Sequence, residues 1–231
     1  MNILFMGGFG NNTLNYFIEN KLISQNNQYY LLNTDKRTLI KENSNKNNFN
    51  NINTILLFEN YFSGLGSDGH IDKVMEIALK NEEYLLSFLD KNGLNIFVTG
   101  LAGGTGTGLC GAYNEILKKY NYNVCFIVTT PFEFEGEYKK RIASGVIDKI
   151  KNGNILIIPN EKLFHIMDRK ALLSEAFGFV SKFIHWVIEI IGRHSNITIN
   201  ELNDDEKKYL SLISFEDINL FINKMNNMWV Q

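Results

Sequence analysis

Short apolar runs alternate with stretches of helical periodicity along most of the chain. Strand-like apolar runs occur at residues 3–6, 29–33, 55–58, 96–99, 124–128 and 155–158. Apolar spacing closer to the helical period than to two occurs at residues 14–22, 71–89, 109–119 and 138–151. Strands that alternate with helices are typical of a parallel sheet covered by helices on both faces. We therefore expect an α/β fold of three layers.

Two further segments interrupt this alternation. Residues 41–53 are rich in Asn and Lys and offer little to bury, so we expect a polar loop. Residues 171–191 are apolar on nearly every side, but Glu175, Lys182 and Glu189 argue against a membrane span and favour a buried helix. The apolar surface of this helix requires cover. Either a partner chain or a second copy covers it, or the C-terminal residues fold back over it.

A glycine-rich run at residues 103–108 lies between a strand-like stretch and a helix-like stretch. Its sequence, Gly-Gly-Thr-Gly-Thr-Gly, has four glycines in six residues. Glycines let a backbone pass close to a ligand with its N–H groups turned inward, and the following helix adds a positive dipole end. This run therefore predicts an anion site, with a polyphosphate as the expected anion.

Two common phosphate-binding motifs fit this run incompletely. A P-loop needs Lys and then Ser or Thr directly after its last glycine, but residues 109–110 are Leu and Cys. Residues 106–111 satisfy the G-x-G-x-x-G pattern of dinucleotide-binding folds. However, the next strand ends in two threonines, at 129–130, where an NAD enzyme usually has an acidic residue. An NAD-dependent enzyme stays open as a minor alternative.

Several segments, in order along the chain, together resemble the tubulin and FtsZ family. They are the first strand and glycine-rich loop at 2–12, Asn-Thr-Asp at 33–35, Gly-Leu-Gly-Ser-Asp-Gly at 64–69, the glycine-rich loop at 100–108, Pro-Phe-Glu-Phe-Glu-Gly at 131–136 and Ile-Ile-Pro-Asn at 157–160. The resemblance covers nearly the whole chain and implies a Rossmann-like nucleotide-binding fold. It implies GTP or GDP as the ligand and makes Mg²⁺ a candidate companion.

The same resemblance implies a domain organisation. Residues 1–170 match the nucleotide-binding domain, and residues 171–231 match a long central helix followed by a divergent acidic loop and a terminal helix. The second domain of the family is not matched. We therefore expect self-association or an FtsZ-type partner chain.

The family's ligand contacts can be carried over residue by residue. The first glycine-rich loop matches at Gly8, Gly10, Asn11 and Asn12, although Phe9 stands where the family has a glycine and is expected to narrow the pocket. The phosphate contacts of the family match Gly103, Gly104, Thr105, Gly106, Thr107 and Gly108.

The expected contacts with the ribose and the base lie further along the chain. Glu135 matches a ribose-contacting Glu, and Lys139 stands where the family usually has Arg. Phe177 matches an aromatic residue near the base. Ser181 replaces the Asp or Asn that accepts the guanine N–H groups, and this change weakens the expected preference for guanine.

The resemblance also implies how hydrolysis would occur. In this family a neighbouring subunit inserts an acidic loop against the terminal phosphate. The matching segment is residues 212–217, in which only the last carboxylate, Asp217, is kept, while residues 203–205 offer a second acidic cluster with the wrong spacing. A water-orienting group contributes about 10²–10⁴-fold, so its loss would slow hydrolysis without abolishing nucleotide binding.

Composition narrows the remaining possibilities. The 231 residues carry a net charge of −2 with dispersed basic residues, so we expect no nucleic-acid partner. No targeting signal or transmembrane segment is expected, and two cysteines suggest a reducing compartment, so we expect a cytoplasmic protein. Cys110 is expected to be a buried thiol. The histidines lack metal-ligand spacing, so no metal site is expected.

Three functions from different classes remain. The favoured one is a GTP-binding, FtsZ-like protein that acts as a slow or assembly-dependent GTPase linked to a cytoskeletal or cell-division filament. The second is a non-hydrolysing nucleotide-binding regulator or cap of a full-length FtsZ-type filament. The third is the NAD-dependent enzyme.

Overall fold

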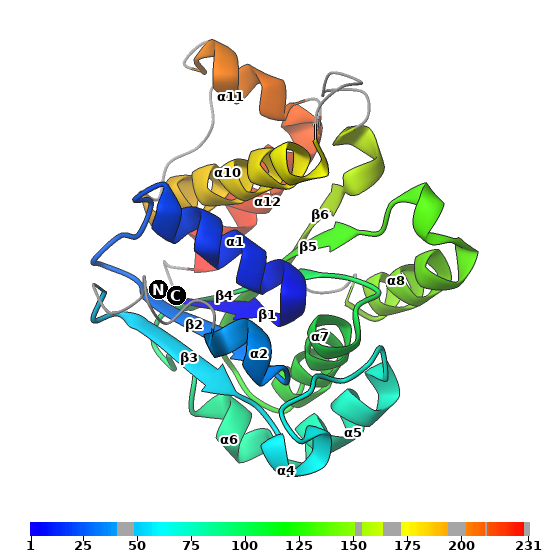
Figure 1. The fold of residues 1–231 in the computed structure, drawn as a ribbon. Coiled ribbons are helices and arrows are strands. Elements are labelled where there is room, and N and C mark those ends of the chain that lie inside the picture. Colours follow the sequence, from blue (N-terminus) through cyan, green and yellow to red (C-terminus); the bar gives the residue numbers. More distant parts are fainter. Residues whose placement is uncertain (41–48, 151–153, 164–171, 194–201, 211, 229–231) are drawn as a thin grey trace.

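The computed structural model describes residues 1–40, 49–150, 154–163, 172–193, 202–210 and 212–228 of the chain. They form a six-stranded parallel sheet with the order β3-β2-β1-β4-β5-β6 (Figure 1). The strands are β1 (Asn2–Met6), β2 (Gln28–Asn33), β3 (Ile52–Leu56), β4 (Leu94–Gly100), β5 (Asn123–Thr130) and β6 (Ile155–Pro159). The expected parallel α/β sheet is confirmed.

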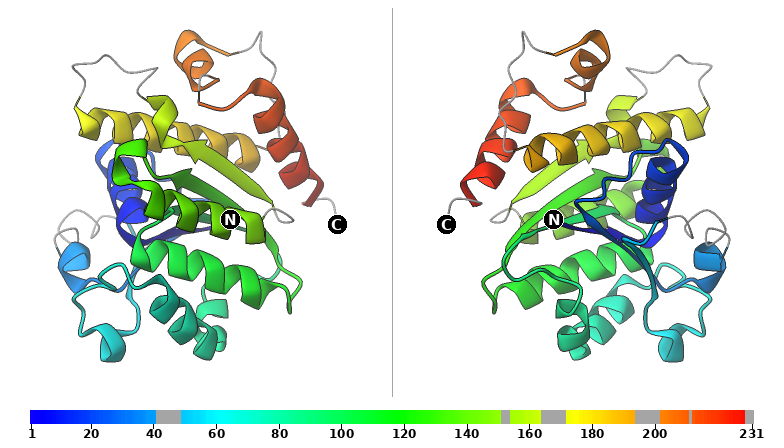
Figure 2. Two further views of the ribbon diagram at one scale, coloured as in Figure 1. Left: turned by 90° about the vertical axis from the view of Figure 1, so that its right-hand side faces the viewer. Right: turned by 90° about the vertical axis from the view of Figure 1, so that its left-hand side faces the viewer.

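Helices cover both faces of this sheet and complete the three expected layers (Figure 2). One face carries α1 (Gly7–Glu19), α10 (Leu173–Gly192) and α12 (Phe215–Met228). The other face carries α5 (Ile71–Lys80), α7 (Gly104–Leu117) and α8 (Glu137–Ile150). Shorter helices are α2 (Lys36–Ile40), α4 (Glu59–Phe62), α6 (Glu82–Leu86) and α11 (Asp204–Tyr209).

The central strand β1 shows how this layering produces the apolar runs. Ile3 and Phe5 belong to the core cluster that includes α10, whereas Leu4 and Met6 belong to the cluster that includes α7. All four side chains are fully buried. Because both faces of the sheet are covered, the strand is apolar at successive positions instead of alternating with polar residues.

The third strand lies earlier in the sequence than expected. The sequence predicts it at 55–58, but β3 ends at Leu56, and Phe58 has a left-handed φ of 58° that a strand does not tolerate. β3 is an edge strand, so its polar Asn53 and Thr54 keep partial contact with solvent. The start of β3 also overlaps the expected polar loop at 41–53, of which residues 41–48 lie outside the described residues.

The helix expected at 71–89 is divided in two. α5 ends at Lys80 and α6 begins at Glu82, with Asn81 between them. The side-chain Nδ2 of Asn81 donates to the carbonyl oxygen of Ile77 at 2.8 Å. This bond satisfies one of the last carbonyls of α5, which have no partner further along the helix.

The glycine-rich runs are helical rather than loops. α1 begins at Gly7 and α7 at Gly104, so most of these glycines lie in first helical turns. Glycine is about 1 kcal/mol less favourable than alanine in a helix, which makes such a start costly. Close packing overrides this preference. A Cβ at Gly106 would meet the Thr99 hydroxyl and lie 3.1 Å from the carbonyl oxygen of Met6.

The long apolar helix is α10, and the described C-terminal residues fold back over it. Tyr209 packs against Phe179, Phe183 and Trp186 with ring centroids 5.2–5.3 Å apart. Trp186 Nε1 donates to Glu206 Oε1 at 2.9 Å. Figure 1 shows α11 above α10 and α12 passing behind it. Of the two expected ways to cover α10, the fold-back is therefore observed. None of the described helices is both long and apolar enough for a membrane crossing.

Candidate functional site

A cavity of about 470 Å³ lies where the strands end at their carboxyl edge. Its lining includes Asn33 at the end of β2, Gly100 at the end of β4, Thr129 near the end of β5 and Asn160 directly after β6. Open parallel sheets bind ligands at this edge, and small-molecule sites measure roughly 300–1,000 Å³. We refer to this cavity as the glycine cavity.

Two helix starts meet in the glycine cavity. α1 follows β1 and α7 follows the neighbouring β4, and a Cβ at Gly7 would lie 2.8 Å from the backbone nitrogen of Gly106. Neither N-cap residue, Met6 or Gly103, caps its helix with a side chain in the described structure. The N–H groups of the first turns and two positive dipole ends are therefore available to an anion.

A cluster of three hydroxyls fixes the segments around the start of α7. Thr105 Oγ1 lies 2.7 Å from Thr34 Oγ1 and 3.1 Å from Ser67 Oγ, and all three side chains are buried. A Cβ at Gly104 would meet Ser67 Oγ and lie 2.9 Å from the Cα atom of Gly69. These contacts pack three segments closely together: residues 33–35, residues 64–69 and the start of α7.

Arg37 and Asp35 form a paired group at one side of the glycine cavity. Arg37 Nε donates to Asp35 Oδ1 at 3.0 Å, and an Nη atom donates to Oδ2 at 2.8 Å. The same guanidinium reaches the carbonyl oxygen of Leu65 at 3.0 Å. The hydrogen bonds from Arg37 hold the pKa of the Asp35 carboxyl below its ordinary value.

A second ion pair lies at the other side of the cavity. Lys139 Nζ lies 2.9 Å from Glu135 Oε2, and Glu135 Oε1 accepts a hydrogen bond from the Phe132 backbone at 2.9 Å. With Asp68, the lining residues carry three carboxylates (Asp35, Asp68, Glu135) against two cations (Arg37, Lys139). Attraction for a polyphosphate therefore comes from the helix starts and not from the net side-chain charge.

Two aromatic rings form the apolar part of the lining. The ring centroids of Phe9 and Phe177 lie 6.4 Å apart, with the planes at 72°. Phe9 also covers Gly100, where a Cβ would lie 2.8 Å from the Phe9 Cβ. A planar base thus has an aromatic surface to pack against, and Phe9 occupies part of the space.

The structure brings together eight of the residues expected to bind nucleotide. They are Gly8, Gly103, Gly104, Thr105, Gly106, Glu135, Lys139 and Phe177, which all line the glycine cavity. Their placement by separate elements, α1, α7, α8 and α10 among them, follows from the sheet topology.

Six expected residues lie outside the lining in the described structure. They are Gly10, Asn11, Asn12, Thr107, Gly108 and Ser181. A Cβ at Gly10 would lie 2.7 Å from the Phe5 carbonyl carbon, and one at Gly108 would lie 2.7 Å from Val74 Cβ, so these glycines allow close packing. Asn11 is buried within α1, and Asn12 is exposed. Ser181 Oγ donates to the Phe177 carbonyl oxygen at 2.9 Å within α10.

Asn160 and Arg37 are lining residues for which the sequence predicted no ligand contact, although Asn160 ends the family-like segment 157–160. Asn160 is 5% exposed, and its Oδ1 has no hydrogen-bond partner in the part of the chain that the structure describes. Its position directly after a strand could have marked it, because strand ends meet at the ligand edge. The position of Arg37 carries no comparable signal.

Asp217 lies outside the glycine cavity. It lines a different cavity, of about 330 Å³, along β6 with Ile155, Leu156 and Ile157, and it is not among the residues that line the glycine cavity.

Both acidic segments form helix starts rather than loops. Ser214 Oγ accepts from the Asp217 backbone N–H at 3.1 Å and donates to Asp217 Oδ2 at 2.7 Å, at the start of α12. The cluster at 203–205 begins α11, where Asn203 Oδ1 accepts from the Glu206 backbone N–H at 2.9 Å. Residues 212–214 of the expected acidic loop precede α12, and residues 215–217 form its first turn.

Two further expectations concern the cysteines and the metal ligands. Cys110 and Cys125 are buried free thiols, and desolvation raises the pKa of Cys110 to about 12. Within the described ranges no group of three or more His, Cys, Asp or Glu side chains is placed to hold a metal ion.

Fold and cavity together define an α/β domain of the kind that binds nucleotides, with a parallel sheet and two helix starts that meet at its carboxyl edge. The chain belongs to the Tubulin/FtsZ family, whose GTPase-domain model matches residues 2–168. The resemblance noted from separate segments is thereby confirmed.

Relatives and solved structures agree with this assignment. The cell division protein FtsZ of Buchnera aphidicola subsp. Schizaphis graminum is 29% identical over 192 residues, which cover 82% of this chain and 48% of that protein. The mitochondrial division protein fszB of Dictyostelium discoideum is 26% identical over 201 residues, covering 85% and 52%. The chain thus spans about half the length of these curated relatives.

The fold matches that of solved FtsZ. The empty FtsZ dimer of M. jannaschii has a TM-score of 0.69 and 24% identity, covering 91% of this chain and 60% of that one. CetZ2 from Haloferax volcanii, described as a GTPgS-bound protofilament, has a TM-score of 0.64 and 16% identity, covering 82% and 57%.

Proposed function

We propose that this protein binds guanine nucleotide in the glycine cavity. The observation that carries the proposal is the meeting of two uncapped helix starts, at Gly7 and Gly104, at the carboxyl edge of the sheet. Their N–H groups and Thr105 hold the phosphates. Glu135 and Lys139 contact the ribose, and the base packs against Phe177.

Base recognition relies on Asn160 more than on Ser181. Guanine presents N–H donors on the edge that Asp or Asn reads in the family, and Ser181 is buried outside the lining of the glycine cavity. Asn160 Oδ1 is a buried acceptor in the lining without a partner among the described residues. A bound guanine supplies the missing donor.

A divalent cation accompanies the triphosphate in this proposal. The lining side chains sum to a charge of −1, because Asp35, Asp68 and Glu135 outnumber the two cations. Mg²⁺ binds through substrate phosphates and one or two carboxylates, and it offsets this repulsion. Asp68, beside the start of α7, is the carboxylate placed for such a role.

The binding proposal is tested by a pair of glycine variants. A methyl group at Gly104 would meet Ser67 Oγ and the Gly69 backbone, so Gly104→Ala displaces the phosphate site and lowers GTP affinity at least tenfold. Gly145→Ala is the matched control, since its Cβ meets nothing within 4 Å in α8. Equal affinity of the two variants in a GTP titration would contradict the proposed site.

Hydrolysis, in this account, depends on assembly. Asp217 does not line the glycine cavity of its own chain, so in this proposal a second copy brings its Asp217 to the phosphate edge of its neighbour. The CetZ2 structure described as a protofilament supports such stacking in a relative. The division proteins among the relatives support a link to a cytoskeletal or cell-division filament.

Assembly dependence has a direct kinetic test. Turnover per chain rises with protein concentration, and Asp217→Ala lowers turnover without weakening GTP affinity. Mixing Asp217→Ala with Gly104→Ala restores turnover in part, because one copy binds GTP and the other supplies Asp217. Turnover per chain that is independent of concentration would contradict assembly-dependent hydrolysis.

A non-hydrolysing regulator or cap of an FtsZ-type filament is the second candidate. In its favour, the Asp217 carboxylate already accepts a hydrogen bond from Ser214 at the start of α12. A cap co-sediments with full-length FtsZ filaments and shows no turnover at any concentration. Concentration-dependent turnover excludes this candidate.

A further inference from the structure

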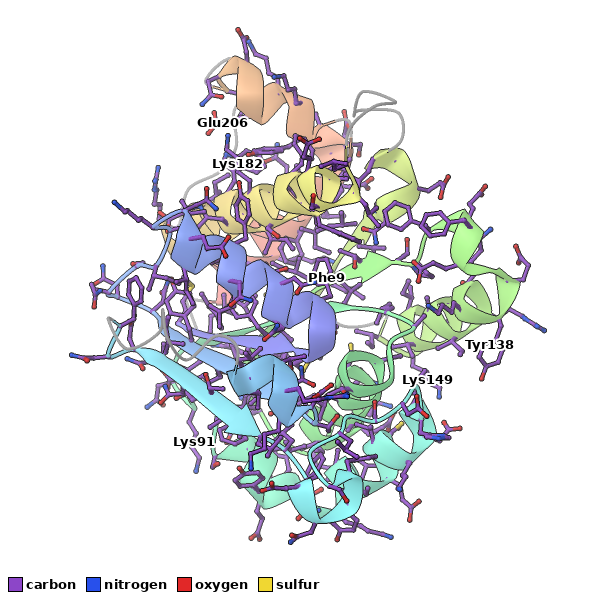
Figure 3. All side chains as sticks on the ribbon, in the orientation of Figure 1. Phe9, Lys91, Tyr138, Lys149, Lys182 and Glu206 are labelled. Carbon is purple, nitrogen blue, oxygen red and sulfur yellow. The ribbon has the colours of Figure 1, made fainter. Side chains whose placement is uncertain are left out.

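A cavity of about 500 Å³ lies between α5, α7 and α8, on the far side of α7 from the glycine cavity. We call it the helix groove. Its lining includes Gly69 and Thr107, which directly follow Asp68 and Gly106 of the glycine cavity. The first turns of α7 separate the two cavities. Figure 3 shows Tyr138 and Lys149 of the groove on the α8 side of the molecule, with Lys91 well away from them.

The helix groove has an excess of positive charge from two helices. Lys73 on α5 and Arg141 and Lys149 on α8 line it, and Asp72 is the only carboxylate among the lining residues. None of these three cations forms an ion pair in the described part of the chain, whereas Arg37 and Lys139 of the glycine cavity are both paired. Lys73 instead lies over the Phe62 ring, 5.1 Å from its centroid.

Hydrogen-bond donors complement these cations. Thr107 is fully buried in the groove wall, and its Oγ1 has no hydrogen-bond partner among the described residues. α5 begins at Ile71 inside the groove, so its first N–H groups and positive dipole end lie there as well. A buried hydroxyl without a partner is unfavourable, and an acceptor on a bound anion would relieve it.

The groove also has an apolar part with open space. Met75, Ile142 and Val146 line it, and a Cβ at Gly145 would meet nothing within 4 Å. A purely inorganic anion would leave this apolar lining in water. An anion with an apolar body satisfies both parts of the lining.

We propose that the helix groove is a second ligand site, which binds a small organic phosphate whose charged group lies among Lys73, Arg141 and Lys149 and whose apolar body packs on Met75, Ile142 and Val146. The site is separate from the glycine cavity and does not require the nucleotide proposal to hold. Because both cavities share the first turns of α7, a ligand in one cavity is expected to change the affinity of the other cavity for its own ligand.

Calorimetric titration of 1-naphthyl phosphate tests the proposal, with the full chain and two kinds of variant. The double variant Arg141→Gln/Lys149→Gln removes two exposed charges and weakens binding at least tenfold. Gly145→Leu fills the open space without changing charge and also weakens binding at least tenfold. Lys91→Gln is the charge control and leaves the affinity unchanged.

A neutral probe tests the role of charge, and a variant of the glycine cavity tests the place of binding. Neutral 1-naphthol binds at least tenfold more weakly than the phosphate, and equal affinity would overturn the role of charge. The variant Arg37→Gln/Lys139→Gln in the glycine cavity keeps the wild-type affinity for 1-naphthyl phosphate, and loss of binding there would assign the probe to the glycine cavity. Wild-type affinity in the Arg141/Lys149 variant, or no binding by the wild type, also overturns the proposal.

Discussion

At the scale of single residues, glycines and one asparagine determine the proposed site. Gly7, Gly104 and Gly106 lack a Cβ where another backbone or a hydroxyl lies too close to admit one. This closeness brings the N–H groups of two helices to one point. Asn160 then adds a buried acceptor to the cavity lining, from which Ser181 is absent.

Base preference therefore responds to Asn160 and not to Ser181. Asn160→Ala removes one hydrogen bond, with a net value of about 1 kcal/mol, and weakens GTP affinity about fivefold with a smaller effect on ATP. Ser181→Ala changes GTP affinity less than twofold, since the lost bond lies inside α10. Parallel GTP and ATP titrations measure both effects. A selective loss of GTP affinity in Ser181→Ala would contradict this assignment.

The cysteines are predicted to be inert in the folded protein. Cys110 and Cys125 are fully buried, and burial raises the pKa of Cys110 to about 12, so neither exposure nor thiolate is available at pH 8. Burial of the neutral thiol stabilises the fold fully below its ordinary pKa of 9.0, and this contribution is lost as pH rises towards about 12. A thiol reagent should label both only on unfolding, and rapid labelling at pH 8 would contradict this placement.

At the scale of elements, the sequence predicts strands better than glycine-rich helix starts. Buried parallel strands are apolar at successive positions, so the six runs are visible in the sequence. The start of α7 at Gly104 is not, because helix propensity argues against it and only contacts with β1, β4 and Gly69 decide it. The break between α5 and α6 at Asn81 depends on one side-chain hydrogen bond, which the apolar periodicity of the sequence does not reveal.

In the glycine cavity too, residues in local sequence motifs are easier to predict than residues brought in by tertiary packing. The place of residues 103–106 in the cavity lining could be predicted, because glycine content and a following helix are local features. Arg37 and Asn160 enter the cavity only through the side-by-side packing of β2, β1, β4, β5 and β6. Gly10 and Gly108 match the family motif but lie in helix packing, a distinction that spacing alone does not make.

The cover over α10 is predicted to contribute strongly to stability. Tyr209 is 3% exposed and contacts three aromatic rings of α10, so Tyr209→Ala lowers the free energy of unfolding by about 3–5 kcal/mol. Tyr61→Ala is the control, because Tyr61 is 52% exposed, and it changes stability by about 0.5 kcal/mol or less. Urea unfolding followed by tryptophan fluorescence measures both, and equal effects would show that α11 does not cover α10.

At the scale of the whole molecule, the glycine cavity and Asp217 lie at separate places. The glycine cavity lies at the carboxyl ends of the strands, and Asp217 lines a different cavity along β6. In the proposed function one copy binds the nucleotide, whereas hydrolysis requires Asp217 of another copy. This separation makes the proposed hydrolysis a property of an assembly and leaves binding as the property of a single chain.

Binding is therefore the first quantity to measure. A fluorescent GTP analogue is titrated against the purified protein in the presence of Mg²⁺ and then displaced separately by unlabelled GTP, ATP and NAD. We expect saturable binding and displacement by GTP at least tenfold more effective than by ATP or NAD. No binding of the analogue, or displacement by NAD as effective as by GTP, would contradict the proposal that the glycine cavity holds a guanine nucleotide.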